Sequence, residues 1–171
     1  YGNNIVLDDI SYDVIENTVT FIAGPNGEGK TTFLNILSGL LLPDSGTISF
    51  SIPQKDVFVI LSGDKNLYAK NTVKENIIYV STLKGMKKID IQKNIKKNAH
   101  YFPIYDSIKN KFVEELSFGQ KRLITIFIGL VTNASCLILD EPSEGLDLAH
   151  KQQLINLIRS LKNQVTFIIS S

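Results

Sequence analysis

The 171-residue chain has only one cysteine, Cys136, and no tryptophan. A single cysteine cannot form an intrachain disulfide, which excludes the disulfide-stabilised class of small secreted domains and favours a reducing compartment. The sequence also lacks any apolar run that approaches the roughly eighteen residues of a membrane-spanning helix, and no signal peptide is visible. We therefore expect any link between this chain and a membrane to run through another chain.

A strong charge of one sign is missing as well. The 18 Lys and Arg residues nearly balance the 17 Asp and Glu residues, and the formal net charge is +1. This balance argues against a domain that binds nucleic acid through bulk charge, so no nucleic-acid partner is expected. A chain of this length can bury one hydrophobic core, and its alternating strand-like and helix-like segments predict an α/β domain.

The strongest motif is a glycine-rich loop that matches the phosphate-binding pattern G-x-x-x-x-G-K-[ST]. Its residues are Gly24, Pro25, Asn26, Gly27, Glu28, Gly29, Lys30, Thr31 and Thr32. Glycines allow successive backbone N–H groups to converge on phosphate oxygens, because a Cβ atom would block the approach. Lys30 can reach the β- and γ-phosphates, and the Thr31 hydroxyl can ligate Mg²⁺. A predicted strand, Val19–Ala23, enters the loop and a predicted helix, Thr31–Ser38, leaves it, which puts phosphate at a helix N-terminus.

A second motif follows the apolar strand predicted for Cys136–Leu139. Asp140 and Glu141 come directly after it, and successive side chains of a strand point to opposite faces, so the two carboxylates are expected to have different roles. An Asp at this place can hold Mg²⁺ beside the phosphate loop, and the neighbouring Glu can polarise an attacking water. Alone, these residues would fit an ordinary strand end before a turn. The phosphate loop upstream favours the catalytic interpretation.

The third motif, Leu116–Arg122, reads L-S-F-G-Q-K-R and precedes an apolar helix predicted for Leu123–Val131. Ser117 is a good helix N-cap, and Gly119 removes side-chain bulk from the first turn. An exposed helix N-terminus with a free hydroxyl is an anion site. Because the phosphate loop already occupies one end of the fold, a second anion site implies a nucleotide held by a partner. The alternative is a plain helix cap, which Ser117 is expected to be in either case.

The order and spacing of these motifs resemble the nucleotide-binding domain of ABC (ATP-binding cassette) ATPases. In that family L-S-G-G-Q-[KR]-R is the signature, and D-E-P-[ST]-x-G-L-D, here Asp140–Asp147, joins the Walker B strand to the D-loop. The resemblance covers nearly the whole chain and extends to Pro43–Ile48 and Thr72–Ile77. It implies an α/β fold of the ABC ATPase type, with a P-loop NTPase (RecA-like) core and a mainly helical insertion.

The resemblance also implies ATP and Mg²⁺ as cofactors and a division of roles among the motifs. It assigns catalysis to Glu141 and Lys30 and the metal to Thr31 and Asp140. The phosphate loop, from Gly24 to Thr32, would hold ATP. A second ABC domain, in a homodimer or heterodimer, would cover this ATP with its signature. In the same way, the signature and D-loop of this chain would act on the ATP of the partner, through Ser117, Gly119, Gln120 and Asp147.

Several departures from the family pattern bear on activity. Gly63 stands where the family has the Q-loop glutamine, and Phe118 replaces the middle glycine of the signature, adding bulk near the partner's nucleotide. The chain stops at Ser171, where the family's next residue is the switch histidine, and it starts without the strand that precedes the adenine-stacking aromatic. Tyr1 matches that aromatic, although a frayed terminal tyrosine is the ordinary alternative. We therefore expect low hydrolytic activity from the chain as given.

We expect two lobes within one ABC domain, residues 1–171. The ATP-binding core, about 1–68 and 132–171, would contain strands near Ile5–Leu7, Val19–Ala23, Ile48–Ser51, Val57–Leu61, Cys136–Leu139 and Val165–Ile169. The insertion, about 69–131, would contain helices at Val73–Leu83 and Ile91–Ala99. The insertion also carries a cluster of lysines: Lys84, Lys87, Lys88, Lys93, Lys96 and Lys97. We interpret this cluster as a solvated helix face rather than as a contact with anionic lipid or a membrane subunit.

Three functions are compatible with this sequence. The favoured one is the ATP-binding and hydrolysing subunit of an ABC transporter, peripheral on the cytoplasmic face of the cell membrane, whose ATP-dependent dimerisation powers partner transmembrane subunits. The second is a soluble ABC ATPase that acts in translation or DNA repair. The lack of a long coiled coil argues against the repair type. The presence of a single cassette argues against the translation type, which has two cassettes in tandem. The third, favoured by Gly63 and by the missing switch histidine, is a nucleotide-gated module with weak or no hydrolysis.

Overall fold

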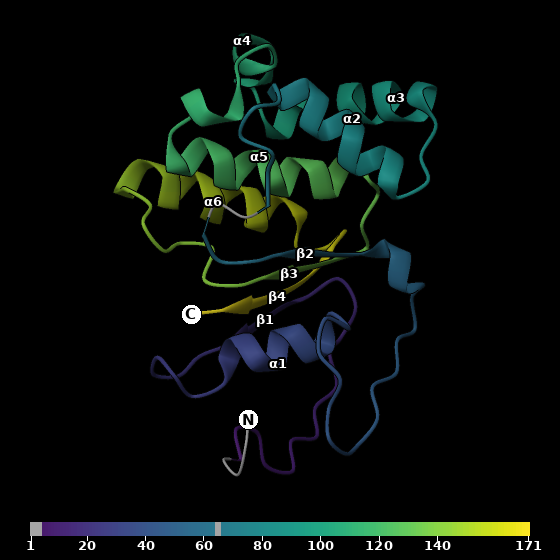
Figure 1. The fold of residues 1–171 in the computed structure, drawn as a ribbon, viewed down its shortest axis with the longest axis vertical. Coiled ribbons are helices and arrows are strands. Elements are labelled where there is room, and N and C mark those ends of the chain that lie inside the picture. Colours follow the sequence, from purple (N-terminus) through teal and green to yellow (C-terminus); the bar gives the residue numbers. More distant parts are fainter. Residues whose placement is uncertain (1–4, 64–65) are drawn as a thin grey trace.

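The computed structural model describes residues 5–63 and 66–171. In this part of the chain four strands form one parallel sheet, in the order β1-β4-β3-β2. The strands are β1 (Val19–Ile22), β2 (Val57–Ile60), β3 (Cys136–Leu139) and β4 (Thr166–Ser170). Parallel strands end at a common edge, so the segments that follow the neighbouring strands β1, β4 and β3 meet there (Figure 1).

Helices cover both faces of the sheet, as buried parallel strands require (Figure 1). On one face lies α1 (Lys30–Leu37), and on the other lie α5 (Phe118–Val131) and α6 (Leu148–Leu161). Alternate strand residues divide between the two faces because the side-chain period of a strand is two. Ile138 of β3 packs in the cluster that contains Leu34 of α1, whereas its neighbour Leu137 belongs to the larger cluster with α5 and α6.

A second helical layer covers α5 on the side away from the sheet (Figure 1). It consists of α2 (Val73–Leu83), α3 (Lys88–Asn98) and the short α4 (Tyr105–Ile108). The remaining helical turns are of the 3₁₀ type, at Gln54–Asp56, Ala99–Tyr101 and Val113–Glu115. With neighbours on both sides, α5 is buried at every residue from Leu123 to Val131, which explains its apolar sequence. Among the described residues, no helix is both long enough and apolar enough to cross a membrane.

Two of the expected strands are wrong. Ile5–Leu7 and Ile48–Ser51 have irregular backbone, and Ile5 is 78% exposed. A short apolar segment indicates extended backbone, but it becomes a strand only when a neighbouring strand accepts its hydrogen bonds. The other four expected strands lie where the sequence placed them to within one residue. The helix expected from Leu123 begins at Phe118, because the Ser117 cap starts it directly.

The six clustered lysines of the insertion are exposed, with the exception of Lys84. Lys84 is half-buried at the end of α2, where its ammonium donates to the carbonyls of Lys55 at 3.0 Å and Val57 at 2.8 Å. The same group lies 5.8 Å from the centre of the Phe58 ring, and burial lowers the pKa of Lys84. Lys84 therefore ties α2 to the start of β2, while the other five lysines of that set are exposed.

A fully buried asparagine fixes the connection that leads from the sheet into α2. The side-chain oxygen of Asn76 accepts the Tyr68 N–H at 2.8 Å. Its amide group donates to the carbonyls of Tyr68 at 3.1 Å, Asn71 at 3.3 Å and Thr72 at 3.0 Å. Each of the three carbonyls also accepts a backbone N–H, so the Tyr68 N–H is the group that depends on the Asn76 side chain alone.

Replacing Asn76 with Ala should therefore lower the free energy of unfolding by about 1–3 kcal/mol, because it removes a fully buried amide and leaves the Tyr68 N–H without its partner. Urea unfolding followed by circular dichroism measures this change. The exposed Gln92→Ala on α3 is the control and should stay within about 0.5 kcal/mol of the wild type. Equal stability of the two variants would contradict the role given to Asn76.

Cys136 should be inert in the folded protein. It is 5% exposed on β3, and burial raises the pKa of its thiol to about 11, so the reactive thiolate is scarce near neutral pH. Iodoacetamide followed by mass spectrometry should find no modification under native conditions and full modification in urea. Rapid labelling of the native protein would show that β3 is more accessible than the structure indicates.

Candidate functional site

The phosphate loop connects β1 to α1 and depends on two glycines with left-handed backbone. Gly27 has φ 90° and Gly29 has φ 88°, conformations that residues with a Cβ rarely adopt. A Cβ on Gly29 would also lie 2.8 Å from the Val6 side chain. The first turn of α1 carries no acidic residue and no side-chain cap, so its backbone N–H groups are directed at whatever anion the loop holds.

The remaining residues of the loop lie around Lys30. The tip, Pro25–Glu28, is exposed, and Thr32 is half-buried on α1. Lys30 itself is only 8% exposed. Its ammonium donates to the carbonyls of Gly24 at 2.6 Å and Pro25 at 3.1 Å, and the Asn26 side-chain oxygen lies 3.5 Å away. The loop thus folds around this cation and holds it at the carboxyl edge of the sheet.

Thr31 and Asp140 meet across that edge. The Thr31 hydroxyl lies 3.1 Å from each carboxylate oxygen of Asp140, a residue that is 2% exposed. Asp140 follows β3, and Ser170 at the end of the adjacent β4 donates its hydroxyl to Asp140 Oδ1 at 2.8 Å. A hydroxyl and a carboxylate beside a phosphate loop are the hard oxygen ligands that Mg²⁺ prefers, with phosphate and water as its other ligands. No group of three or more His, Cys, Asp or Glu residues suited to a metal occurs in the described part of the chain.

Glu141 leaves the line of the strand. Its φ is 42°, a left-handed conformation that costs a residue other than glycine about 1 kcal/mol or more. Its backbone N–H donates to Ser170 Oγ at 2.8 Å. Its carboxylate Oε1 lies 3.9 Å from the Lys30 ammonium, and the side chain is 29% exposed. The bend therefore turns Glu141 toward the phosphate loop, while Asp140 stays buried beneath it.

The signature residues cap α5. Ser117 Oγ accepts the Gln120 N–H at 3.2 Å, and Gln120 Oε1 accepts the Ser117 N–H at 3.1 Å. This capping box confirms that Ser117 is the helix N-cap. Gly119 is buried against the His150 ring, which any Cβ at this position would strike. The Phe118 ring packs within its own chain, beside Gly145 and under the guanidinium of Arg122 at 5.8 Å.

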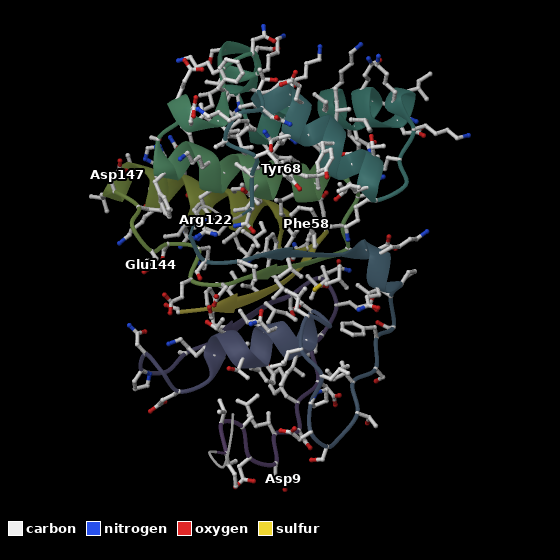
Figure 2. The ribbon with its side chains drawn as sticks, viewed as in Figure 1. Asp9, Phe58, Tyr68, Arg122, Glu144 and Asp147 are labelled. Carbon is white, nitrogen blue, oxygen red and sulfur yellow. The ribbon has the colours of Figure 1, made fainter. Side chains whose placement is uncertain are left out.

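Asp147 caps α6 next to the signature. Asp147 Oδ1 accepts the backbone N–H of His150 at 2.8 Å, and the His150 ring nitrogen Nδ1 lies 2.9 Å from both carboxylate oxygens. The hydrogen bond from the His150 backbone N–H and, to a smaller extent, the bond from its ring hold the pKa of Asp147 below its ordinary value. Asp147 is exposed at the end of the turn that follows Glu141. Figure 2 shows it at the outer end of α6.

The sequence-predicted residues therefore fall into two groups. The phosphate loop gathers with Asp140 and Glu141, whereas the signature gathers with Asp147 through His150. Tyr1, expected to stack on adenine, lies outside the described residues. Gly63 has φ 74°, so a glutamine at this place would need a strained backbone.

Sequence reasoning missed two polar residues that organise these groups, Ser170 and His150. Arg122, the last residue of the signature motif, donates its guanidinium to the Leu61 carbonyl at 2.9 Å. A serine at the end of an apolar strand was the available signal for Ser170, since that strand ends at the phosphate edge. His150 bonds to Asp147 only three residues earlier, but its contact with Gly119 joins distant segments and gave no comparable signal.

Comparison with known families agrees with this geometry. The family model described as "ABC transporter" matches residues 7–144. The chain belongs to the ABC transporter family. It is 32% identical over 96% of its length to the energy-coupling factor transporter ATP-binding protein EcfA2 of Clostridioides difficile. It is also 32% identical over 99% of its length to the zinc import ATP-binding protein ZnuC of Rickettsia conorii, of which it covers 71%.

Solved structures of ABC cassettes have the same fold. CbiO1 of Clostridium perfringens, part of the ABC transporter complex cbiONQ, superposes with a TM-score of 0.84 at 27% identity, over 97% of this chain and 71% of cbiO1. An ATP-binding cassette in its ADP conformation gives a TM-score of 0.86 at 24% identity, over 100% of this chain and 76% of that cassette. The expected ABC-type α/β fold is therefore confirmed. The chain spans 62% of EcfA2 and 59% of the Bacillus subtilis ABC transporter ATP-binding protein YhaQ.

In this ABC cassette, Lys30→Ala should weaken ATP binding about ten- to a hundredfold while the fold is retained, because the charged hydrogen bonds from its ammonium to phosphate are lost. Calorimetric titration of the folded variant measures the affinity. Lys162→Ala, exposed at the far end of α6, is the matched control and should bind ATP as the wild type does. Unchanged affinity in the Lys30 variant would reject the phosphate-loop assignment.

Proposed function

We propose that this chain is the ATP-binding and ATP-hydrolysing subunit of an ABC transporter, which powers transport through partner membrane subunits. The observation that carries the proposal is the assembly of Lys30, Thr31, Asp140 and Glu141 at the carboxyl edge of one sheet. A phosphate loop alone serves many nucleotide-binding families. The addition of a capped signature helix and a D-loop in the same chain supports the ABC type of ATPase.

In this proposal the phosphate loop holds the triphosphate of ATP. The backbone N–H groups at the start of α1 and the Lys30 ammonium bind the β- and γ-phosphates. Lys30 would exchange its bonds to the carbonyls of Gly24 and Pro25 for phosphate oxygens. Thr31 and Asp140 would hold Mg²⁺, which supplies positive charge against the phosphates when it is bound.

Glu141 is assigned the water-activating role. Its carboxylate faces the phosphate loop, 3.9 Å from the Lys30 ammonium, and is partly open to solvent, as a group that receives a proton from water must be. Asp140, buried and hydrogen-bonded to two hydroxyls, is suited to a fixed ligand rather than to proton transfer. The two adjacent carboxylates would therefore divide metal binding and base catalysis between them.

The signature would act on the nucleotide of a second cassette. The side chains of Ser117 and Gln120 bond to each other's backbone, so the first-turn N–H groups of Phe118 and Gly119 are the donors that the helix presents to an anion. Gly119 and Gln120 would contact the partner's ATP with Ser117, and Asp147 would lie at the contact between the two chains. ATP binding would close this dimer, and hydrolysis would reopen it.

Partner transmembrane subunits would receive this motion at the cytoplasmic face of the membrane. The proposal follows the relatives, which include transport proteins for zinc and for lantibiotics and cbiO1, a component of the complex cbiONQ. It also retains the division into an ATP-binding core, about 1–68 and 132–171, and a helical insertion, about 69–131. In the structure α5 lies between the sheet and the outer helices and would transmit movement from one to the other.

A second candidate is a nucleotide-gated cassette with weak hydrolysis. Gly63 favours it, because this position has neither the glutamine side chain nor a backbone conformation that would readily carry one. Such a cassette would bind ATP and close without efficient turnover. The rate of phosphate release by the wild type separates the two candidates.

Glu141→Gln should retain ATP binding, abolish turnover and accumulate a nucleotide-dependent dimer, because the amide cannot take the proton from water. Gel filtration with ATP and a phosphate-release assay measure both effects. Glu144→Gln, three residues along on an exposed turn (Figure 2), is the control and should behave as the wild type. Turnover at the wild-type rate in the Glu141 variant would remove Glu141 from the role of base.

A further inference from the structure

Ser170 is a completely buried hydroxyl at the point where β4 reaches the phosphate edge. It accepts the Glu141 N–H at 2.8 Å and donates to Asp140 Oδ1, also at 2.8 Å. A serine hydroxyl has one proton to donate and lone pairs to accept, so both bonds form at once. One side chain from another strand thus holds the backbone of one acidic residue and the carboxylate of the other.

Both bonds act where the chain departs from ordinary strand geometry. Glu141 is one of the few residues other than glycine with positive φ in the described part of the chain, and its N–H would lose a strong partner without Ser170. This bend is what turns the Glu141 carboxylate toward Lys30. The bond to Asp140 Oδ1 limits rotation of that carboxylate, whose two oxygens both lie 3.1 Å from the Thr31 hydroxyl.

We propose that Ser170 is a positioning residue, whose hydroxyl sets Asp140 for the metal and Glu141 for the attacking water. This inference rests on the proposed ATPase function. It assigns Ser170 no contact with nucleotide, metal or water. Its effect is carried by the orientation of the two carboxylates, and small displacements of reacting groups lower rates steeply.

The same strand provides a matched control for a purely structural role. Thr166, at the opposite end of β4, is also buried, and its hydroxyl accepts the N–H of Asn17 at 2.9 Å. Asn17 has φ 57°, so this bond likewise supports a left-handed residue. Thr166→Val therefore removes a buried hydroxyl from an equivalent bond at the sheet edge away from the phosphate loop.

The experiment compares Ser170→Ala with Thr166→Val in the purified protein. Both should lower the melting temperature. Only Ser170→Ala should lower kcat, by about tenfold or more. Calorimetry gives a readout besides activity: affinity for ATP without metal should be unchanged in Ser170→Ala, while the gain in affinity on adding Mg²⁺ should shrink. Ser170→Thr, which keeps the hydroxyl, should restore both properties if it folds.

Equal kcat and an equal Mg²⁺ effect in Ser170→Ala and Thr166→Val would overturn the inference, because both hydroxyls would then be structural only. A folded Ser170→Thr variant as impaired as Ser170→Ala would overturn it too. If Ser170→Thr does not fold, the comparison of Ser170→Ala with Thr166→Val in kcat and in the Mg²⁺ effect decides. A wild type that binds ATP without turnover contradicts the proposed hydrolysis instead, and the Mg²⁺ effect on affinity then decides the role of Ser170.

Discussion

The hydrogen bond between the Thr31 hydroxyl and the Asp140 carboxylate joins residues 109 positions apart, and the candidate site depends on it. It fixes the start of α1 against the end of β3, although β4 lies between β1 and β3 in the sheet. Because Thr31 follows Lys30, the same contact places the ammonium beside Glu141. The order of the sheet, rather than any local motif, is therefore what turns two separate sequence patterns into one site.

The segment from Asp140 to Asp147 links the two halves of a proposed ATPase cycle. Its first residues lie at the phosphate loop, and its last residue caps α6 beside the signature helix through His150. Between them Gly145 packs against Phe118, the residue that departs from the family's signature. A short and hydrogen-bonded turn thus connects the nucleotide held by one chain with the surface proposed to close on a partner's nucleotide.

Local features were predictable from the sequence, and features that depend on distant segments were not. The phosphate loop, the four core strands and the Ser117 cap each depend on residues close together in the chain. Ile5–Leu7 and Ile48–Ser51 looked like strands, but nothing in a local pattern shows whether a neighbouring strand will pair with them. Ser170 was missed for a related reason, because its two partners belong to the end of a different strand.

The most direct test of the account is the structure of the protein with Mg²⁺ and a non-hydrolysable ATP analogue. The account predicts the metal between Thr31 Oγ1 and the Asp140 carboxylate, with Lys30 Nζ moved from the carbonyls of Gly24 and Pro25 to a phosphate oxygen. A metal bound without Thr31 and Asp140, or an analogue bound away from the start of α1, would contradict it.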